Sequence, residues 1–360
     1  MDDFDKPFLL DHAVALTQAG LEVTVVCPAV PGLPSRHVVA GIEVIRVRYA
    51  PRRFETLATT GSMYREARSI RGVWAVSMMV AMTIATIRQL KPRSAIAYGH
   101  WWIPGGMVAG IAARCMRRSS LIHLHGSDAT VTQSAAIRLV GRKILRMADV
   151  RMAVSDELAN WAQELCSKPV QVLPMPLVFG RFPAPSPPPD DGYVLAVGRL
   201  VPEKGFDVLV DAVGLLEEAQ RPKVTIIGVG PERQRLAEQA RRKGVEIHLP
   251  GAVSPNQMSG WYRDARYVVV PSRREGFGLV AAEAAAMARA VVGTTVGGIS
   301  TVVQDGVSGI LVEPGDVEDL AQALLAVDPA MGEAGPSMVA ALTGERHGSY
   351  LRQICEDLLN

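Results

Sequence analysis

Glu275 and Glu283 stand eight positions apart in the otherwise apolar stretch REGFGLVAAEAAA, residues 274–286. Glu275 comes just before a Gly-Phe-Gly bend, and Glu283 lies inside an alanine-rich run that predicts a helix. Helical spacing places Glu283 beside apolar residues such as Leu279 and not on a polar face. A carboxylate in such surroundings needs hydrogen-bond donors, and sugar hydroxyls are suitable donors. We therefore interpret both glutamates as ligand-binding residues and not as solvated surface charges.

Arg199 lies near the end of the strand-like run YVLAVGRL (193–200), and Lys204 lies in the loop that follows this run. The guanidinium offers planar donors, the ammonium offers a compact charge, and the helix predicted next offers free amides. Gly276 and Gly278 similarly leave amides free at the start of a second helix, whose positive end favours an anion. These strand ends therefore predict a binding pocket for a diphosphate.

A third strand end carries Gly228 and Gly230, which form a Gly-x-Gly after the run KVTIIG. The dinucleotide fingerprint also requires a third glycine and an acidic residue about twenty positions later, and neither follows here. We therefore interpret this sequence as a turn where two backbones approach, and we exclude a dehydrogenase.

Histidines raise the question of a metal site. His123, His125 and Asp128 come at the end of a predicted strand, but they supply at most three ligands and no convincing fourth appears. Asp3 and Asp5 form the only Asp-x-Asp of the chain, in a segment expected to fray. We therefore expect no metal site, and a leaving group stabilised without metal by cations and helix amides.

Strand-like runs rich in β-branched residues alternate with helical patterns through most of the chain. The predicted strands are 21–28, 41–49, 94–100, 120–126, 149–155, 170–174, 193–200, 223–230, 245–251, 265–272, 289–295 and 308–315. The predicted helices are 62–90, 104–116, 133–147, 205–219, 231–243, 255–264, 278–288 and 316–327. This alternation predicts an α/β protein with parallel sheets covered on both faces. We expect two doubly wound Rossmann-like domains facing a cleft, with ligands at the carboxyl ends of the strands.

The stretch FPAPSPPPDDG (182–192) contains five prolines and predicts a stiff interdomain linker. It separates an N-terminal domain, 1–181, from a C-terminal domain, 193–345, and the helix predicted over 346–360 is expected to return to the first domain. The chain opens with a helical pattern, whereas a doubly wound domain normally begins with a strand and a glycine loop. We therefore expect the first strand of the N-terminal domain to be missing and the neighbouring strand edges to be unpaired.

Charge is distributed unevenly along the chain. Residues 1–185 carry 22 Lys/Arg against 13 Asp/Glu, and the remainder carries 16 against 23. A basic half favours anionic partners or an anionic membrane surface, and a solvated arginine-rich face explains it equally well. Four scattered cysteines are typical of a reducing compartment, and the N-terminus does not resemble a signal peptide. The apolar run 72–87 is shorter than a membrane span and predicts a core helix.

Three stretches of the second half resemble the nucleotide-sugar domain of the family 4 retaining glycosyltransferases, which have the GT-B fold. They are VGRLVPEKGFDVLVDAV, IGVGPER and REGFGLVAAEAAAMARAVVGTTVGGISTVVQDGVSGILVEPGDVEDLAQAL. In the first half, GHWWIPGG and HGSD are similar to the N-terminal domain of that family. The resemblance covers nearly the whole chain and is most specific from about residue 193 to 327. It implies an enzyme of glycan biosynthesis that moves a hexose-type sugar from a nucleotide diphosphate sugar to an acceptor hydroxyl, without metal or cofactor.

The resemblance also implies roles for individual residues. Glu275 matches the glutamate that contacts the hydroxyls of the donor sugar, and Glu283 matches the one that holds the ribose. Arg199 and Lys204 match the pair that neutralises the diphosphate, and His125 matches the histidine that faces the donor sugar. Glu275, His125, Arg199 and Lys204 are thus the expected catalytic residues.

Other residues are implied to line the site. Val253 falls where the family holds the base, and His100 and Asp128 are expected on the acceptor side. The remaining donor-site residues are Gly230, Gly276, Phe277, Gly278 and Leu279. In the mechanism that the resemblance implies, the acceptor hydroxyl attacks the anomeric carbon from the leaving-group face, and the protein stabilises the departing diphosphate.

The expected partners are a nucleotide-sugar donor and a glycan, lipid-linked or small-molecule acceptor, with no nucleic acid. We expect a cytoplasmic protein whose basic half can contact the inner face of the membrane. Two alternatives stay open. One is a non-catalytic or truncated, inactive relative that binds a nucleotide sugar or a partner protein. The other is a sugar-nucleotide epimerase of similar fold, which would convert the donor without any acceptor.

Overall fold

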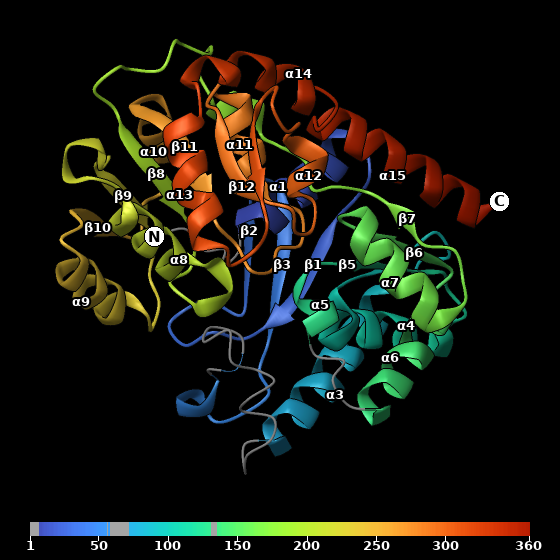
Figure 1. Cartoon of the computed structure of the whole chain (residues 1–360). Coiled ribbons are helices and arrows are strands. Elements are labelled where there is room, and N and C mark those ends of the chain that lie inside the picture. Colours follow the sequence, from blue (N-terminus) through green and yellow to red (C-terminus); the bar gives the residue numbers. More distant parts are fainter. Residues whose placement is uncertain (1–6, 56, 58–71, 131–134) are drawn as a thin grey trace. The chain divides into compact units, whose positions relative to one another are not determined.

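The structure is a computed structural model that describes residues 7–55, 57, 72–130 and 135–360 (Figure 1). The chain forms two compact units. The first unit contains residues 1–176 and 344–360, and the second contains residues 177–343. The boundary therefore precedes the expected one at residue 181, and the proline-rich stretch 182–192 belongs to the second unit.

The second unit contains one six-stranded sheet with the order β10-β9-β8-β11-β12-β13. All neighbouring strands in it are parallel. Numbered along the chain this order is 3-2-1-4-5-6, that of a doubly wound nucleotide-binding fold, and it reverses between β8 and β11. The prediction of a doubly wound domain is confirmed here. The strands are β8 (Tyr193–Val197), β9 (Val224–Ile227), β10 (Ile247–Gly251), β11 (Ala265–Val270), β12 (Val291–Thr294) and β13 (Gly309–Val312).

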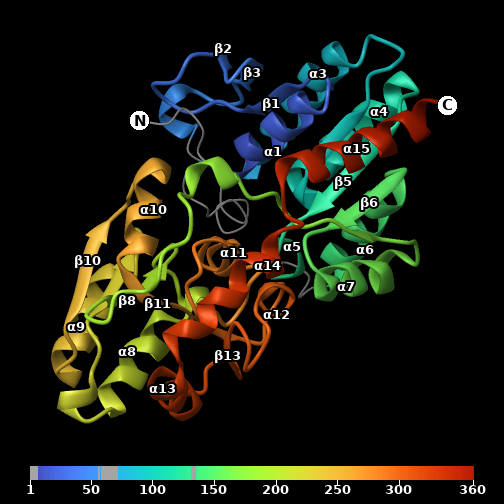
Figure 2. The ribbon, with the colours of Figure 1, turned by 90° about the horizontal axis from the view of Figure 1, so that it is seen from above.

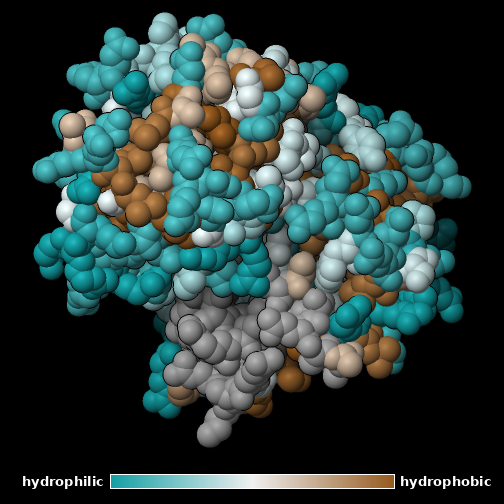
Figure 3. Space-filling model, in the orientation of Figure 1, coloured by the Kyte–Doolittle hydropathy of each residue, from teal (hydrophilic) through white to brown (hydrophobic). Residues whose placement is uncertain are grey.

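Helices cover this sheet because its strands are apolar on both faces. All four residues of β9 and of β12 are buried, as expected for parallel strands packed on two sides. The core joins strand residues such as Val194 and Val292 to Leu209 of α8 and Leu320 of α13. Figure 3 shows apolar side chains at the surface around α13, where Leu325 is half exposed. The helices are α8 (Phe206–Leu215), α9 (Arg233–Lys243), α10 (Pro255–Arg263), α11 (Leu279–Ala286), α12 (Ile299–Val302), α13 (Val317–Ala326) and α14 (Gly335–Val339).

The first unit contains two sheets and not the single sheet that the sequence predicts. One has the order β1-β3-β2, in which β2 is antiparallel to β3, and the other has the parallel order β4-β5-β6-β7. Strands β1 and β4 are therefore edge strands among the described residues. The strands are β1 (Thr24–Pro28), β2 (Arg36–Val39), β3 (Ile42–Val47), β4 (Ala97–His100), β5 (Ser120–Leu124), β6 (Val150–Ala153) and β7 (Gln171–Val172).

The last helix belongs to the first unit, where it packs against the first helix (Figure 2). Leu16 of α1 and Leu351 of α15 share a core cluster with Leu121 of β5 and Met152 of β6. The two ends of the chain thereby cover one face of the β4–β7 sheet. The helices are α1 (Pro7–Gln18), α3 (Gly72–Gln89), α4 (Met107–Met116), α5 (Ser127–Thr130), α6 (Ala135–Met147), α7 (Asp156–Cys166) and α15 (Gly344–Leu359).

Helix α3 corresponds to the apolar run that predicts a core helix, and that prediction is only half right. Met78 and Met82 are buried, but Val73, Val76 and Val80 are each more than half exposed. The helix therefore buries one face only. None of the helices in the described ranges is both long and apolar enough to cross a membrane. Residues 62–71 of the predicted helix 62–90 lie outside the described residues, as do Asp3 and Asp5.

Two glycines of the second unit allow the cost of backbone strain to be measured apart from the cost of a steric clash. Gly205 has φ +66° and a Cβ there would overlap the carbonyl oxygen of Pro271, whereas Gly306 has φ +70° and open space around it. We expect Gly306→Ala to lower the free energy of unfolding by about 1 kcal/mol, because an L side chain disfavours this conformation. Gly205→Ala should cost at least about 2 kcal/mol more, because the loop must also move.

Urea unfolding of the second unit, followed by circular dichroism, measures both changes. Equal losses of stability in the two variants would contradict the inferred contact between Gly205 and Pro271.

Candidate functional site

The sheet order places two predicted site residues together at the switch point of the second unit. The loop after β8 ends in a short 3₁₀ helix, Pro202–Lys204, and the loop after β11 carries Glu275. Lys204 Nζ donates to Glu275 Oε2 at 2.6 Å, and the two side chains are only 20% and 16% exposed. The chain connections after two paired strands run to opposite sides of the sheet at such a switch point, so a ligand is expected between these loops.

Glu275 is held by several donors at once. Oε2 also accepts from Ser272 Oγ at 3.2 Å, and Oε1 accepts from the amide of Gly276 at 3.2 Å. The carboxylate is therefore oriented before any ligand arrives. An ammonium has three N–H donors, so Lys204 can bind Glu275 and a ligand oxygen together.

Two further ion pairs hold the same loops. Arg273 donates to both carboxylate oxygens of Asp207 at 2.7 and 2.8 Å, and Arg274 pairs with Glu203 at 3.2 Å. Burial raises the pKa of Asp207, but the hydrogen bonds and charge of Arg273 outweigh it, so that the pKa is lowered overall. Sequence analysis missed these pairs, because their partners lie some 66 to 71 positions apart.

Glycines allow a third loop to lie against the backbone of residues 275–277. A Cβ at Gly297 would overlap the carbonyl of Glu275, and one at Gly298 would overlap the carbonyl of Phe277. The Gly298 amide donates to the Gly276 carbonyl at 3.1 Å. The loop after β12 thus fixes the path of the chain into α11. Figure 1 shows α11 and α12 side by side, in accordance with their contacts.

Gly278 is the residue that permits helix α11 to begin. It has φ +87°, and no side chain caps the helix there. The first amides of α11 consequently face the loop with no side-chain acceptor, as the sequence predicts. Leu279 begins the helix, and Phe277 is buried below the loop.

Glu283 lies in the second turn of α11 and is half-buried. Its Oε2 accepts a hydrogen bond of 2.7 Å from the hydroxyl of Tyr262, which is fully buried in α10. Burial and the neighbouring carboxylate raise the pKa of Tyr262, so its hydroxyl stays a donor. The sequence gives no signal for Tyr262, because only the packing of α10 on α11 brings it to Glu283.

The other predicted donor residues lie in loops at the same carboxyl edge of the sheet. A Cβ at Gly228 would overlap the Gly198 carbonyl and one at Gly230 would overlap that of Leu200, which confirms a turn of approaching backbones. The Arg199 side chain is exposed and has no hydrogen bond or ion pair with any residue that the structure describes. Val253 lies in the loop between β10 and α10 and is partly exposed.

The first unit brings the remaining predicted residues together. His100 Nδ1 and His125 Nε2 are 3.0 Å apart. Asp128 is fully buried, and its two oxygens accept from the amides of Trp102 at 2.9 Å and His125 at 2.6 Å. Burial raises the pKa of Asp128 to about 7 against the opposing effect of these amides. Asp128 thus fixes the turn that carries His125.

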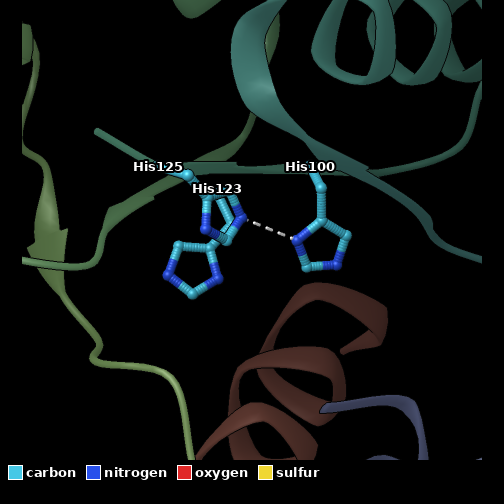
Figure 4. A group of neighbouring side chains, drawn as sticks. All are labelled: His100, His123 and His125. Atoms are coloured by element: carbon cyan, nitrogen blue, oxygen red, sulfur yellow. Dashed lines mark hydrogen bonds between the residues drawn. The ribbon is translucent and has the colours of Figure 1, made fainter. Parts of the chain in front are cut away.

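His123 lies beside His100 and His125, and the three can contribute one ligand nitrogen each within 4.8 Å of one another (Figure 4). The sequence predicts at most three ligands here, and the structure groups three, with His100 of β4 in the place expected for Asp128. Burial lowers the pKa of His100 to about 3, so the ring is neutral. His12 of α1 contacts His100, and His347 of α15 in turn contacts His12.

Comparison with known proteins identifies the family of the chain. Residues 7–178 match the family described as glycosyl transferase 4-like domain, and residues 191–327 match glycosyl transferases group 1. A D-inositol 3-phosphate glycosyltransferase of Xylanimonas cellulosilytica is 30% identical over 366 residues, which cover 89% of this chain and 83% of that protein. The chain belongs to the group 1 glycosyltransferases. It is therefore an enzyme that transfers a glycosyl group.

Solved structures show the fold of this glycosyltransferase to be GT-B. Sucrose-phosphate synthase from Thermosynechococcus elongatus has a TM-score of 0.78 at 21% identity and covers 98% of this chain and 92% of its own. Anabaena HepE, in complex with UDP and glucose, has a TM-score of 0.74 at 18% identity and covers 99% and 98%. The resemblance inferred from the motifs is thereby confirmed.

Asp128 and Asp149 provide a matched test of how the first unit is held. Both oxygens of Asp128 accept from amides, whereas a single oxygen of the exposed Asp149, Oδ2, accepts from Ser120. An asparagine at 128 must turn its NH₂ group toward an N–H, so we expect Asp128→Asn to lower the free energy of unfolding by about 2–3 kcal/mol. Asp149→Asn keeps its acceptor and should cost less than about 1 kcal/mol.

Urea unfolding of the first unit compares these two variants. A fully stable Asp128→Asn variant would show that the two amide contacts do not hold the turn.

Proposed function

We propose that this glycosyltransferase is a retaining, metal-independent hexosyltransferase that uses a nucleotide diphosphate sugar. The observation that carries the proposal is the pairing of Lys204 with Glu275 at the switch point of a doubly wound sheet. One residue of the pair suits a phosphate and the other suits sugar hydroxyls. Both lie beside helix starts that lack side-chain caps.

The donor diphosphate is assigned to Lys204, Arg199 and the first amides of α8 and α11. Arg199 is exposed just after the end of β8, so the N–H donors of its guanidinium can turn toward a ligand. Helix starts and cations at this position neutralise the negative charge that develops on a departing diphosphate. Such stabilisation requires no metal ion.

The sugar and ribose are assigned to the two carboxylates. Glu275 accepts from the hydroxyls of the transferred sugar, and Glu283, oriented by Tyr262, accepts from the ribose hydroxyls. Val253 is placed near the base. The backbone that lines the sugar and phosphates comes from Gly230, Gly276, Phe277, Gly278 and Leu279. The presence of UDP and glucose in the similarly folded HepE supports this assignment.

In the proposed mechanism the acceptor hydroxyl attacks the anomeric carbon from the face that the diphosphate leaves, so configuration is retained. The leaving phosphate accepts the proton of the hydroxyl. His125 of the first unit is assigned to the donor sugar, and His100 is assigned to the acceptor side, where the buried Asp128 contributes by fixing the turn that carries His125. The excess of Lys/Arg over residues 1–185, 22 against 13 acidic residues, supports an anionic glycan or lipid-linked acceptor.

A panel of nucleotide diphosphates and their sugar conjugates tests this function. At saturating concentration the true donor should raise the melting temperature of the second unit, because a ligand that binds only the folded state stabilises it. Slow release of free sugar from the same compound, without acceptor, should accompany the shift. If no nucleotide of the panel raises the melting temperature or is hydrolysed, the proposal fails.

Lys204 should be essential for turnover and not for folding. We expect Lys204→Ala to reduce kcat by about 10²–10³-fold, because a cation that stabilises the leaving group is lost. Lys223→Ala removes an exposed lysine next to the start of β9, at the opposite edge of the sheet, and should leave kcat unchanged. Donor turnover with circular dichroism as a folding check measures both. Normal turnover in Lys204→Ala would contradict the role of Lys204 in stabilising the leaving group.

Two buried tyrosines, when changed to phenylalanine, allow an effect on nucleotide binding to be distinguished from an effect on stability. Tyr262→Phe removes the donor to Glu283, whereas Tyr267→Phe removes a hydrogen bond to the Leu324 carbonyl that lies away from the loops. Both changes should lower stability by about 1 kcal/mol. Only Tyr262→Phe should weaken nucleotide binding, by about three- to tenfold, in a calorimetric titration. If both variants weakened nucleotide binding equally, the assignment of Glu283 to the ribose would be contradicted.

A further inference from the structure

One face of β4 and β5 carries three imidazoles. His100 and His123 are partners in the register of the two strands, and His125 follows His123 by two positions, so all three point to the same face. One ring nitrogen of each lies within 4.8 Å of the others. Figure 4 shows the rings grouped on one side of the sheet, with His100 joined to His125.

The hydrogen bonds of His123 fix which of its nitrogens has a lone pair. Nε2 faces the carbonyl oxygen of Leu173 at 2.8 Å, and a carbonyl can only accept, so Nε2 carries the proton. Nδ1 then has the lone pair, which accepts from the hydroxyl of Tyr98 at 2.9 Å. A histidine whose far nitrogen is held by a backbone carbonyl is oriented as metal ligands usually are.

His12 of α1 adds a fourth imidazole with an unused lone pair. His347 donates to the Pro174 carbonyl, so its Nε2 accepts from His12 Nδ1 at 2.7 Å. His12 Nε2 is thereby left as an acceptor, and no residue that the structure describes donates to it. The side chain is 2% exposed, and its ring meets that of His100 edge-on at 4.8 Å between centroids. A buried acceptor without a donor is costly.

We propose that His100, His123 and His125 form a binding site for a zinc ion, with His12 packed edge-on beside His100. Neutral imidazole is a preferred zinc ligand, and Zn–N bonds of about 2.0–2.1 Å place tetrahedral ligands about 3.3 Å apart. The 3.0 Å between His100 Nδ1 and His125 Nε2 matches this spacing. Among the ligand nitrogens of His100, His123 and His125, which all lie within 4.8 Å of one another, the widest separation must close by up to about 1.5 Å.

Zinc binding requires lone pairs on the nitrogens that face the ion. Of His100 and His125, the ring that donates in the hydrogen bond between them must move its proton to its far nitrogen, so that ring changes tautomer and no proton is released. Tyr98 must give up its hydrogen bond to His123 Nδ1, and its hydroxyl therefore competes with the ion. The donor diphosphate site does not use this ion.

The site also has a consequence for the proposed function. His125 is the histidine assigned to the donor sugar, so bound zinc withdraws it and slows transfer. The test is therefore based on metal uptake and not on turnover, which keeps a failure of this proposal separate from a failure of the donor assignment.

The experiment uses the full chain without a histidine tag, stripped with EDTA and desalted. Titration with Co²⁺ should give d–d absorption bands of a tetrahedral or five-coordinate nitrogen site, and Zn²⁺ should abolish them. Elemental analysis after gel filtration should find one zinc per chain. His248→Gln, which changes an exposed histidine of the second unit, is the control and should bind as the wild type does.

Two variants decide whether the ion occupies this cluster. His123→Gln keeps a donor for Leu173 and should lower zinc affinity at least tenfold. Tyr98→Phe removes the competing hydroxyl and should raise zinc affinity several-fold. If His123→Gln fails to fold, Tyr98→Phe decides alone. The proposal is overturned if the wild type takes up no stoichiometric zinc, if His123→Gln binds zinc as tightly as the control, or if Tyr98→Phe leaves the affinity unchanged.

Discussion

The close approach of the loop after β8 to the loop after β11 governs the geometry of the second unit's site. Gly205 meets the Pro271 carbonyl where a Cβ could not fit, and this contact brings Lys204 to Glu275. Ion pairs from Arg273 and Arg274 hold the same loops. Because strand order reverses between β8 and β11, the two loops leave in different directions. Polar side chains at their ends can then contact a ligand without contacting the core.

The elements of the second unit could be predicted from sequence, because local signals agree there. Most of its strands are short apolar runs rich in β-branched residues, and each expected strand is found within a few residues. The residues proposed for the diphosphate follow from the rule that ligands bind at carboxyl strand ends. Tyr262 could not be found this way. Its contact with Glu283 depends on how α10 packs on α11, and neither helix sequence encodes that crossing.

The first unit departs further from its prediction, for two physical reasons. Helix α3 is apolar around most of its circumference, so periodicity cannot tell the face that buries Met78 from the face that exposes Val76. Strand pairing is a non-local property, and the separation into two sheets follows from which strand edges find partners. The short antiparallel strand β2, with alternating exposure, lacks the apolar run by which the other strands were recognised.

The histidines show how a polar layer can be buried without charge. Five of the seven histidines in the chain meet on one face of β4 and β5. A neutral imidazole has one donor and one acceptor, so such rings can satisfy one another in a chain that ends at backbone carbonyls, as His347 does at Pro174. The two printed donors of Asp128 are backbone amides and not imidazoles, so this carboxyl group holds the turn and not the rings. The layer therefore holds the His125 ring in an ordered position, which suits a sugar hydroxyl and equally a metal ion.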